Sequence, residues 1–234
     1  MAGRRAGCQH VNPGPELVIF DCDGVLVDSE RLTTKVEARV LTELGWPMEQ
    51  AEVVQRWMGR TSQAQLAEVT ARLGTEVAAR FDALTTDELH AAFETELEPV
   101  AGIPELLDHL QEHGVAACVA SSGTHHRMSV TLRVTGLRDR FEGRIFSGSE
   151  VAHAKPAPDL FLHAAARMGV EPHRCVVVED SVFGVRAGVA AGMRVYGFAG
   201  GLTPAAALAD AGAEVVHEMS DLVGLLPHSP SRIA

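Results

Sequence analysis

Two carboxylates separated by a single residue end an apolar run near the start of this 234-residue sequence. Asp21 and Asp23 follow the run at 17–20 and precede Gly24. Asp and Gly are poor strand formers and two close like charges repel, so packing alone does not explain this pattern. A divalent cation would offset the repulsion, and hard oxygen ligands suit Mg²⁺. The stretch therefore predicts a Mg²⁺-dependent site for phosphoryl transfer.

A second apolar run ends in hydroxyl groups. Ser121 and Ser122 follow the run at 116–120, and Gly123 and Thr124 lead into a helical segment. A helix N-terminus with exposed N–H groups and a hydroxyl can bind an anion. The alternative interpretation is that Ser122 or Thr124 only caps the helix.

A third apolar run, at 175–178, ends in the adjacent acids Glu179 and Asp180. Two neighbouring carboxylates at the end of an all-apolar strand again need a reason, and metal coordination supplies one. Asp21, Asp23, Glu179 and Asp180 are therefore the candidate metal ligands.

Lys155 is one of only two lysines in the sequence, with Lys35, although arginines are abundant. It stands between Ala154 and Pro156, and Pro158 follows, so prolines restrict the backbone there. The choice of a compact ammonium over a guanidinium indicates a specific role for Lys155. A solvated loop lysine is the alternative.

The residues from about 100 onward alternate short apolar runs with helical segments. Continuous apolar strands separated by helices predict a Rossmann-like α/β fold, a parallel sheet with helices on both faces. Ligands in such sheets bind beyond the carboxyl ends of the strands, so the polar strand ends should converge. Besides the first run we expect strands at 116–120, 144–147, 175–178, 194–198 and 214–216, and helices near 103–113, 125–135, 158–168, 184–191 and 204–211.

Residues 29–97 have a different texture, rich in Ala, Leu, Glu, Gln and Arg and without a convincing strand. This composition predicts an all-helical cap domain inserted into the α/β core. We expect its helices at 29–44, 48–57, 62–73 and 86–97. The core domain would comprise residues 17–28 and 98–226, with a flexible tail at 1–16 and a frayed tail at 227–234.

The composition limits the function classes. A net charge of −11 argues against binding to nucleic acid or to an anionic membrane, but not against a phosphorylated substrate. No apolar stretch reaches the ~20 residues of a membrane span, and the first sixteen residues lack the apolar region of a signal peptide. The four cysteines have no CxxC spacing and read as reduced thiols, which favours a cytoplasmic location.

Four motifs occur in a recognisable order, and on them the chain resembles the haloacid dehalogenase-like hydrolase superfamily. They are Asp21-Cys22-Asp23-Gly24-Val25-Leu26-Val27-Asp28-Ser29, Val119-Ala120-Ser121-Ser122, Lys155-Pro156, and Val178-Glu179-Asp180-Ser181 with Gly184 and Ala191-Gly192-Met193. The resemblance is nearest to the branch that contains β-phosphoglucomutase-like proteins and small sugar-phosphate phosphatases.

The resemblance implies a division of roles. Asp21 would attack phosphorus and form an aspartyl-phosphate, and Asp23 would protonate the leaving oxygen and then activate water. Mg²⁺ would be held by the Asp21 carboxylate, the Asp23 main-chain carbonyl and Asp180, while Glu179 would orient metal-bound waters or help to bind the ion.

The resemblance also implies binding residues. Ser121, Ser122 and Lys155 would hold the phosphoryl oxygens. A Gly turn in the cap, Gly59-Arg60-Thr61, would be the specificity loop, with Arg60 gripping a phosphate or carboxylate of the substrate. A solvated Arg60 is the alternative.

Three other activities compare less well with the sequence. Dehalogenases of the superfamily lack the second acid and the metal-type pair. β-Phosphoglucomutases use a His soon after the first motif and a Lys late in the cap, whereas here no His follows Asp28 closely and the only cap lysine is Lys35. Receiver-type phospho-switches are about half this length and carry an adjacent acidic pair. We therefore expect a Mg²⁺-dependent phosphatase, a monomer or weak dimer, that hydrolyses a small phosphorylated metabolite, in particular a sugar phosphate, with phosphosugar mutase as the alternative.

Overall fold

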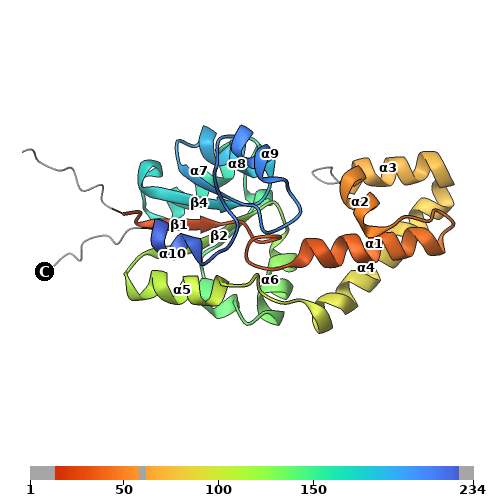
Figure 1. The fold of residues 1–234 in the computed structure, drawn as a ribbon, viewed down its shortest axis with the longest axis horizontal. Coiled ribbons are helices and arrows are strands. Elements are labelled where there is room, and N and C mark those ends of the chain that lie inside the picture. Colours follow the sequence, from red (N-terminus) through yellow and green to blue (C-terminus); the bar gives the residue numbers. More distant parts are fainter. Residues whose placement is uncertain (1–13, 58–61, 227–234) are drawn as a thin grey trace, which may run out of the picture.

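The computed structural model describes residues 14–57 and 62–226 of the chain. Its centre is a parallel sheet of six strands with the order β3-β2-β1-β4-β5-β6 (Figure 1). All the strands expected from the sequence are present, with ends that move by at most one residue. They are β1 (Leu17–Phe20), β2 (Ala116–Ser121), β3 (Ile145–Ser147), β4 (Cys175–Glu179), β5 (Arg194–Phe198) and β6 (Glu214–Val216).

Strand β1 lies at the middle of the sheet, between β2 and β4. Leu17 is in register with Ala116 on one side and with Cys175 on the other. All four β1 residues are fully buried because the sheet is covered on both faces, which is why the run carries no polar residue. The carboxyl ends of β1, β2 and β4 therefore meet at one edge.

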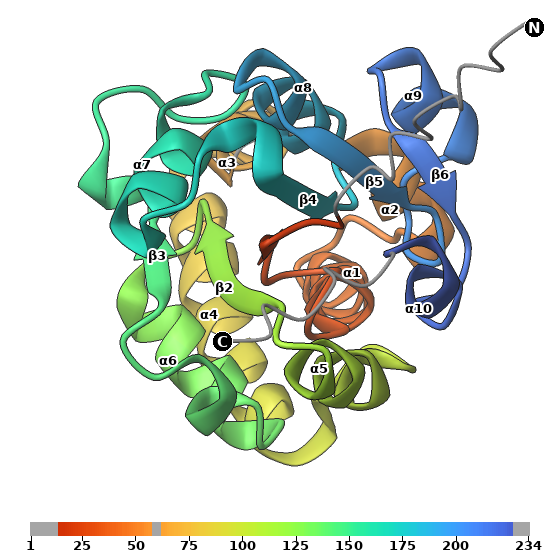
Figure 2. The same ribbon diagram turned by 90° about the vertical axis from the view of Figure 1, so that its left-hand side faces the viewer.

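Helices cover each face of the sheet (Figure 2). Val18 and Phe20 pack with α5, α6 and α10, whereas Leu17 and Ile19 pack with α7, α8 and α9, as the alternation along a strand requires. These helices are α5 (Ile103–Glu112), α6 (His125–Val134), α7 (Asp159–Met168), α8 (Val182–Ala190), α9 (Ala205–Asp210) and α10 (Asp221–Leu225), with short 3₁₀ turns at Arg138–Phe141, Gly148–Glu150 and Pro172–Arg174.

A helical insertion, α1 to α4, separates β1 from the rest of the sheet and lies beyond the carboxyl end of β1 (Figure 1). It has its own hydrophobic core, in which the Trp57 ring packs edge-to-face against Trp46 and Phe81. Trp57 is thus a core residue of the insertion. The helices are α1 (Ser29–Glu43), α2 (Gln50–Trp57), α3 (Ser62–Leu73) and α4 (Thr75–Glu96).

The expected start of the fourth helix was wrong. We expected it near residue 86, but α4 begins at Thr75. Ala78 and Phe81 are buried in the core of the insertion, and this packing stabilises a segment whose threonines lower its intrinsic helix propensity. The short α10 was also not expected.

The two connections between the insertion and the sheet run side by side. The Asp28 N–H donates to the Glu98 carbonyl at 3.1 Å, and the Val100 N–H donates to the Leu26 carbonyl at 3.0 Å. An isolated antiparallel bridge joins Val27 to Pro99. Among the helices that the structure describes, none is long and apolar enough to cross a bilayer.

Candidate active site

Three strand ends bring their polar residues together, as the parallel topology requires. Lys155 Nζ donates to Asp21 Oδ1 at 2.7 Å and to Glu179 Oε1 at 2.6 Å. It also donates to the Ala120 carbonyl at 3.2 Å and lies 4.8 Å from the centroid of the Phe161 ring. Because only 5% of the Lys155 side chain is exposed, the solvated-loop alternative is wrong.

The environment of Asp21 raises the pKa of its carboxyl group to about 7. Burial is the largest cause, and the nearby Glu179 carboxylate adds to it, while the Lys155 ammonium acts in the opposite direction. The same two carboxylates raise the pKa of Lys155, even though burial by itself would lower it. Lys155 therefore stays charged between two acids.

Asp23 lies in an environment of opposite character. Both oxygens accept hydrogen bonds from Arg127, the shortest from Nη2 at 2.9 Å, and Oδ1 also accepts from Ser29 Oγ at 2.5 Å. Burial alone would raise the pKa of Asp23, but the charge and hydrogen bonds of Arg127 and the Ser29 hydroxyl lower it. Two acids placed two residues apart thus have pKa values shifted in opposite directions.

Sequence reasoning did not identify Arg127 or Ser29 as a partner of Asp23. In the structure the Asp28 side chain makes no capping hydrogen bond, and the Ser29 hydroxyl donates a hydrogen bond to Asp23. One signal for Arg127 was present: it is a basic residue in the first turn of a helix, where the macrodipole disfavours positive charge. Such a residue indicates an anionic partner.

The hydroxyl residues that follow β2, Ser121, Ser122 and Thr124, have different roles. Ser121 is buried and its Oγ accepts from the Gly123 N–H at 3.2 Å. Thr124 caps α6 by accepting from the Arg127 N–H at 3.2 Å. Ser122 is exposed and does not cap the helix. Both serines therefore lie at the strand end without serving the cap.

Glu179 is held by two groups. Its Oε2 accepts from the Ser181 N–H at 2.8 Å and from the Ser181 hydroxyl at 2.9 Å, and its Oε1 accepts from Lys155. A Cβ on Gly184 would collide with this carboxylate, so the first turn of α8 approaches it closely. These contacts fix the position of the Glu179 carboxyl group at the end of β4.

Asp180 has a carboxylate oxygen without a hydrogen-bond partner among the described residues. This oxygen, Oδ2, is buried. Burial, followed by the charges of Glu30, Glu179 and Asp21, raises the pKa of Asp180 well above its ordinary value. Gly24 has a positive φ of 78°, and a Cβ there would collide with this same oxygen. The backbone of the β1 loop therefore leaves room beside Asp180 that a side chain would fill.

Glu30 is a further acid that sequence reasoning did not single out. Burial first and then the Asp23 charge raise its pKa to about 7, while a hydrogen bond with Asp180 acts in the opposite direction. Near the carboxyl ends of β1 and β4, five acids therefore face two cations. The acids are Asp21, Asp23, Glu30, Glu179 and Asp180, and the cations are Lys155 and Arg127.

These groups fit a hard divalent cation. The unpartnered Asp180 oxygen, the space kept by Gly24 and the excess of negative charge all favour one. In the part of the chain that the structure describes, no three His, Cys, Asp or Glu side chains form a metal cage. An ion would be held by two carboxylates and a main-chain carbonyl, with waters completing its shell, as Mg²⁺ prefers.

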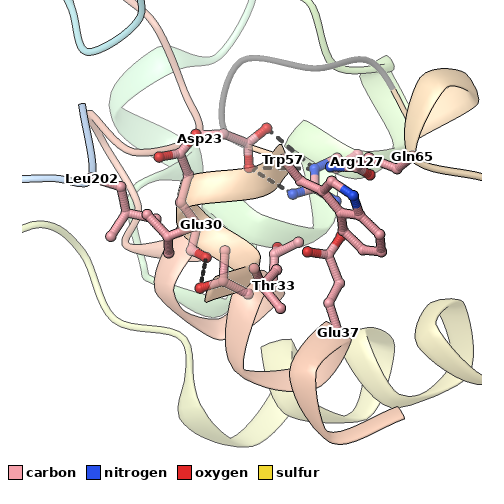
Figure 3. Close-up of a pocket in the computed structure, with 11 residues that line it drawn as sticks. Asp23, Glu30, Thr33, Glu37, Trp57, Gln65, Arg127 and Leu202 are labelled. Carbon is pink, nitrogen blue, oxygen red and sulfur yellow. Dashed lines mark hydrogen bonds and ion pairs between the residues drawn. The ribbon is translucent and has the colours of Figure 1, made fainter. Parts of the chain in front are cut away.

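A cavity of about 210 Å³ lies between Asp23 and the helical insertion (Figure 3). The expected specificity residues Gly59, Arg60 and Thr61 lie outside the described residues. Besides Asp23 and Arg127, the cavity is lined by Glu30, Thr33, Thr34, Glu37, Val53, Val54, Trp57, Gln65 and Leu202.

The arrangement supplies the parts of a group-transfer site. Asp21 offers a buried carboxylate oxygen as a nucleophile, and Asp23 offers a second carboxyl group that can carry a proton. Lys155 and the Ser121 hydroxyl offer donors to an anion that approaches Asp21. The adjoining cavity is smaller than the roughly 300–1,000 Å³ of most small-molecule sites, so it suits a small metabolite.

Comparison with known proteins gives a consistent result. The family model of haloacid dehalogenase-like hydrolases matches residues 15–192. The chain is 32% identical over 184 residues to 6-phosphogluconate phosphatase of Escherichia coli, covering 78% of this chain and 82% of that protein. It is 30% identical to the phosphorylated carbohydrates phosphatase of Thermotoga maritima, covering 90% and 98%. A haloacid dehalogenase-like protein of unknown function from Agrobacterium tumefaciens has a similar structure, with a TM-score of 0.80, 39% identity and coverage of 91% and 97%.

Proposed function

Because this chain belongs to the haloacid dehalogenase-like hydrolase family and is a phosphatase, we propose that it hydrolyses a small phosphorylated carbohydrate through an aspartyl-phosphate on Asp21. The single observation that carries this proposal is the contact of Lys155 with both Asp21 and Glu179 beyond the strand ends. The Lys155 ammonium holds one Asp21 oxygen in place. Its positive charge also reduces the electrostatic repulsion between Asp21 and an incoming phosphate. The names of the two phosphatases support a carbohydrate as the leaving group.

In the first step an Asp21 oxygen attacks phosphorus, and the bond between phosphorus and the alcohol oxygen breaks. Protonated Asp23 gives its proton to the departing alcohol oxygen. The hydrogen bonds from Arg127 and Ser29 fix the Asp23 carboxyl group, so its position is set before substrate arrives. The products of this step are the free carbohydrate and phosphorylated Asp21.

In the second step water attacks the same phosphorus atom. Asp23, now a carboxylate, takes the proton from that water, and the bond between phosphorus and Asp21 breaks. Inorganic phosphate leaves and the Asp21 carboxylate is restored. The lowered pKa of Asp23 favours the carboxylate that this step needs, and binding of the anionic substrate must favour the protonated form that the first step needs.

Asp21, Asp180 and the main-chain carbonyl of Asp23 would hold Mg²⁺, and Glu179 would orient the metal-bound waters. When bound, the ion neutralises charge on the transferring phosphoryl group. Lys155, Ser121 and Ser122 would bind phosphoryl oxygens that do not take part in bond breaking.

We further propose that the helical insertion, residues 29–97, is a cap that excludes bulk water and bears the specificity residues Gly59, Arg60 and Thr61. The three described cysteines are free and buried, which is consistent with a reducing, cytoplasmic environment. A net charge of −11 supports a small-molecule substrate over nucleic acid or an anionic membrane. A monomer or weak dimer would suffice, since the candidate residues all come from one chain.

The proposal is tested with Asp21→Asn, which keeps the size of the side chain and removes the nucleophilic oxygen. We expect turnover of p-nitrophenyl phosphate and of a panel of sugar phosphates with Mg²⁺ to fall at least about 1,000-fold. The matched control is Asp108→Asn, an exposed acid on α5 that pairs with Arg140 and should retain activity. Mass spectrometry of the wild-type protein after a rapid acid quench should show a phosphorylated Asp21.

Other outcomes would contradict the proposal. If Asp21→Asn kept near wild-type turnover, Asp21 could not be the nucleophile. One equivalent of phosphate and no more would favour a phospho-switch. Conversion of one sugar phosphate into its isomer, followed by ³¹P NMR, would favour a phosphosugar mutase.

A further inference from the structure

One face of α1 points into the cavity beside Asp23. Ser29, Thr33 and Glu37 are spaced four residues apart, so they lie one above another on the helix. The hydrogen bond from Ser29 to Asp23 shows that this face of α1 points toward the site. Thr33 and Glu37 lie on the same face and line the cavity. Figure 3 shows the Glu37 side chain extending from α1 toward Trp57 and Arg127.

Glu37 is buried and has no partner among the residues that the structure describes. The residue is 6% exposed, and no described residue makes a hydrogen bond or an ion pair with its carboxyl group. Among the described residues, only Thr85 Oγ1 and Asp180 Oδ2 are completely sealed and unpartnered. The Glu37 oxygens are therefore open to the cavity, and a group that enters it can reach them.

An unpartnered carboxyl group in such a place is unfavourable for folding, since burial penalises its charged form. Burial raises the pKa of Glu37 to about 7. Leu or Gln would fill the same position on the helix without that penalty. An acid at this position is therefore best explained by a ligand that supplies the missing partner.

The surroundings define the chemistry of that ligand. A carboxylate accepts hydrogen bonds, and hydroxyl groups are the neutral donors of a carbohydrate. Val53, Trp57 and Leu202 add apolar wall. Arg127 is the only cation that lines the described part of the cavity, and its guanidinium is already paired with Asp23. A second anionic group of a substrate would therefore meet Glu37 with no free described cation to balance it.

We propose that Glu37 is a specificity-determining residue that accepts hydrogen bonds from hydroxyl groups of the leaving group and selects phosphate monoesters of neutral sugars and polyols. Substrates with a second anionic group beside Glu37 are disfavoured. This inference rests on the proposed function, because it concerns the alcohol that the phosphatase releases.

The test compares two substrates that differ in one group. Sorbitol 6-phosphate and 6-phosphogluconate share a six-carbon chain, but the second carries a carboxylate in place of a terminal hydroxymethyl group. We expect the wild-type protein to have the higher kcat/KM for sorbitol 6-phosphate. Glu37→Leu should lower kcat/KM for sorbitol 6-phosphate about 10- to 100-fold, the effect of losing hydrogen bonds to a charged acceptor. The loss with p-nitrophenyl phosphate, which has no hydroxyl on its leaving group, should be far smaller.

Glu37→Gln separates charge from hydrogen bonding and keeps the shape of the side chain. It should raise kcat/KM for 6-phosphogluconate relative to sorbitol 6-phosphate by at least about tenfold, because the repulsion disappears. Glu43→Gln is the matched control, since Glu43 is on the same helix but exposed and pairs with Arg39. It should leave the ratio unchanged.

An equal loss on all three substrates by Glu37→Leu, or an unchanged ratio in Glu37→Gln, would overturn the role of Glu37 and leave the phosphatase intact. A wild-type preference for 6-phosphogluconate would do the same. Absence of turnover with every phosphate monoester would instead overturn the proposed function, so the two failures are distinguishable. Should Glu37→Leu not fold, the ratio measured with Glu37→Gln decides.

Discussion

At the residue scale, the two acids of the first motif have different partners although only one residue separates them. Asp21 pairs with Lys155, which in turn pairs with Glu179, so Asp21 shares its cation with another acid. Asp23 pairs with the guanidinium group of Arg127, which it shares with no other described acid. Environments that push two pKa values apart are typical of acids with separate catalytic tasks. The assignment of Asp21 as nucleophile and Asp23 as proton carrier is not read from this difference: the raised pKa of Asp21 favours its neutral form, and a bound divalent cation would shift it back toward the charged form.

Glu37 gives a pH-dependent prediction that needs no substrate. Its pKa is about 7 in the folded protein and near 4.5 in the unfolded chain. Between these values the folded state binds more protons, so the contribution of Glu37 to the free energy of unfolding falls as pH rises from 4.5 to 7. Glu37→Gln removes this loss. We expect the variant to match the wild type near pH 4.5 and to be more stable by up to about 3 kcal/mol at pH 8.

The measurement is the difference in Tm between the two proteins across pH 4.5–8. Each kcal/mol corresponds to about 2–4 °C in a chain of this size, so the difference is measurable. Glu43→Gln, on the exposed side of α1, should show no trend. A difference that does not vary with pH would mean that Glu37 has an ordinary pKa.

Sequence reasoning singled out polar residues at the ends of strands, which the structure brings together, and missed residues on helices that line the same cavity. Asp21, Glu179 and Lys155 were identified because charge at the end of an apolar run, or a rare residue type, is visible in one dimension. Arg127 and Glu37 sit in ordinary helical patterns, and only the tertiary structure brings them to the cavity. No periodicity carries that information.

At the element scale, the loop after β1 and the end of β4 must approach closely. Gly24 N–H donates to the Val27 carbonyl at 2.9 Å and closes the loop, with Gly24 in the left-handed region at φ 78°. The space beside Asp180 exists because Gly24 has no Cβ. The loop thus positions the Asp23 main chain and the Asp180 carboxylate together.

Gly24→Ala should therefore damage metal use more than folding. The new methyl group would displace the Asp180 carboxylate, and we expect the Mg²⁺ concentration for half-maximal activity to rise about 10- to 100-fold. Gly45→Ala is the matched control, since Gly45 has φ 93° but no atom within 4 Å of its added Cβ. Both variants carry backbone strain of about 1–2 kcal/mol, which Tm reports. An equal Mg²⁺ requirement in the two variants would show that strain alone acts.

The sheet was predictable from sequence to a greater degree than the insertion. Each strand is a short apolar run between polar segments, a pattern that burial on both faces imposes. The first half of α4 was not predictable, because Ala78 and Phe81 are held by packing against other helices rather than by local propensity. The domain boundaries near 28 and 98 remain predictions, since the paired connections belong to both parts.

At the scale of the whole molecule, side chains of the insertion and of the core meet at the site. Ser29 of α1 donates to Asp23, and Arg31 Nη2 donates to the Gly200 carbonyl at 3.2 Å. Arg133 of α6 pairs with Glu94 of α4 at 2.5 Å. These contacts tie the insertion to the core, and the one between Ser29 and Asp23 lies in the site itself.

Mg²⁺ should therefore stabilise the entire fold and not only the site. A ligand at 100 times its Kd adds about 2.7 kcal/mol to the free energy of unfolding, which corresponds to roughly 5–10 °C in Tm. The cation would relieve the excess of acids, and Asp180 carries an oxygen that is buried and has no partner among the described residues. Asp180→Asn should have at least the wild-type Tm in a chelator, because it removes a buried charge, and should gain little from Mg²⁺. Differential scanning calorimetry with EDTA and with Mg²⁺ measures both proteins. An equal gain in the two would place the cation elsewhere, because a site that includes Asp180 cannot lose that ligand without weaker binding.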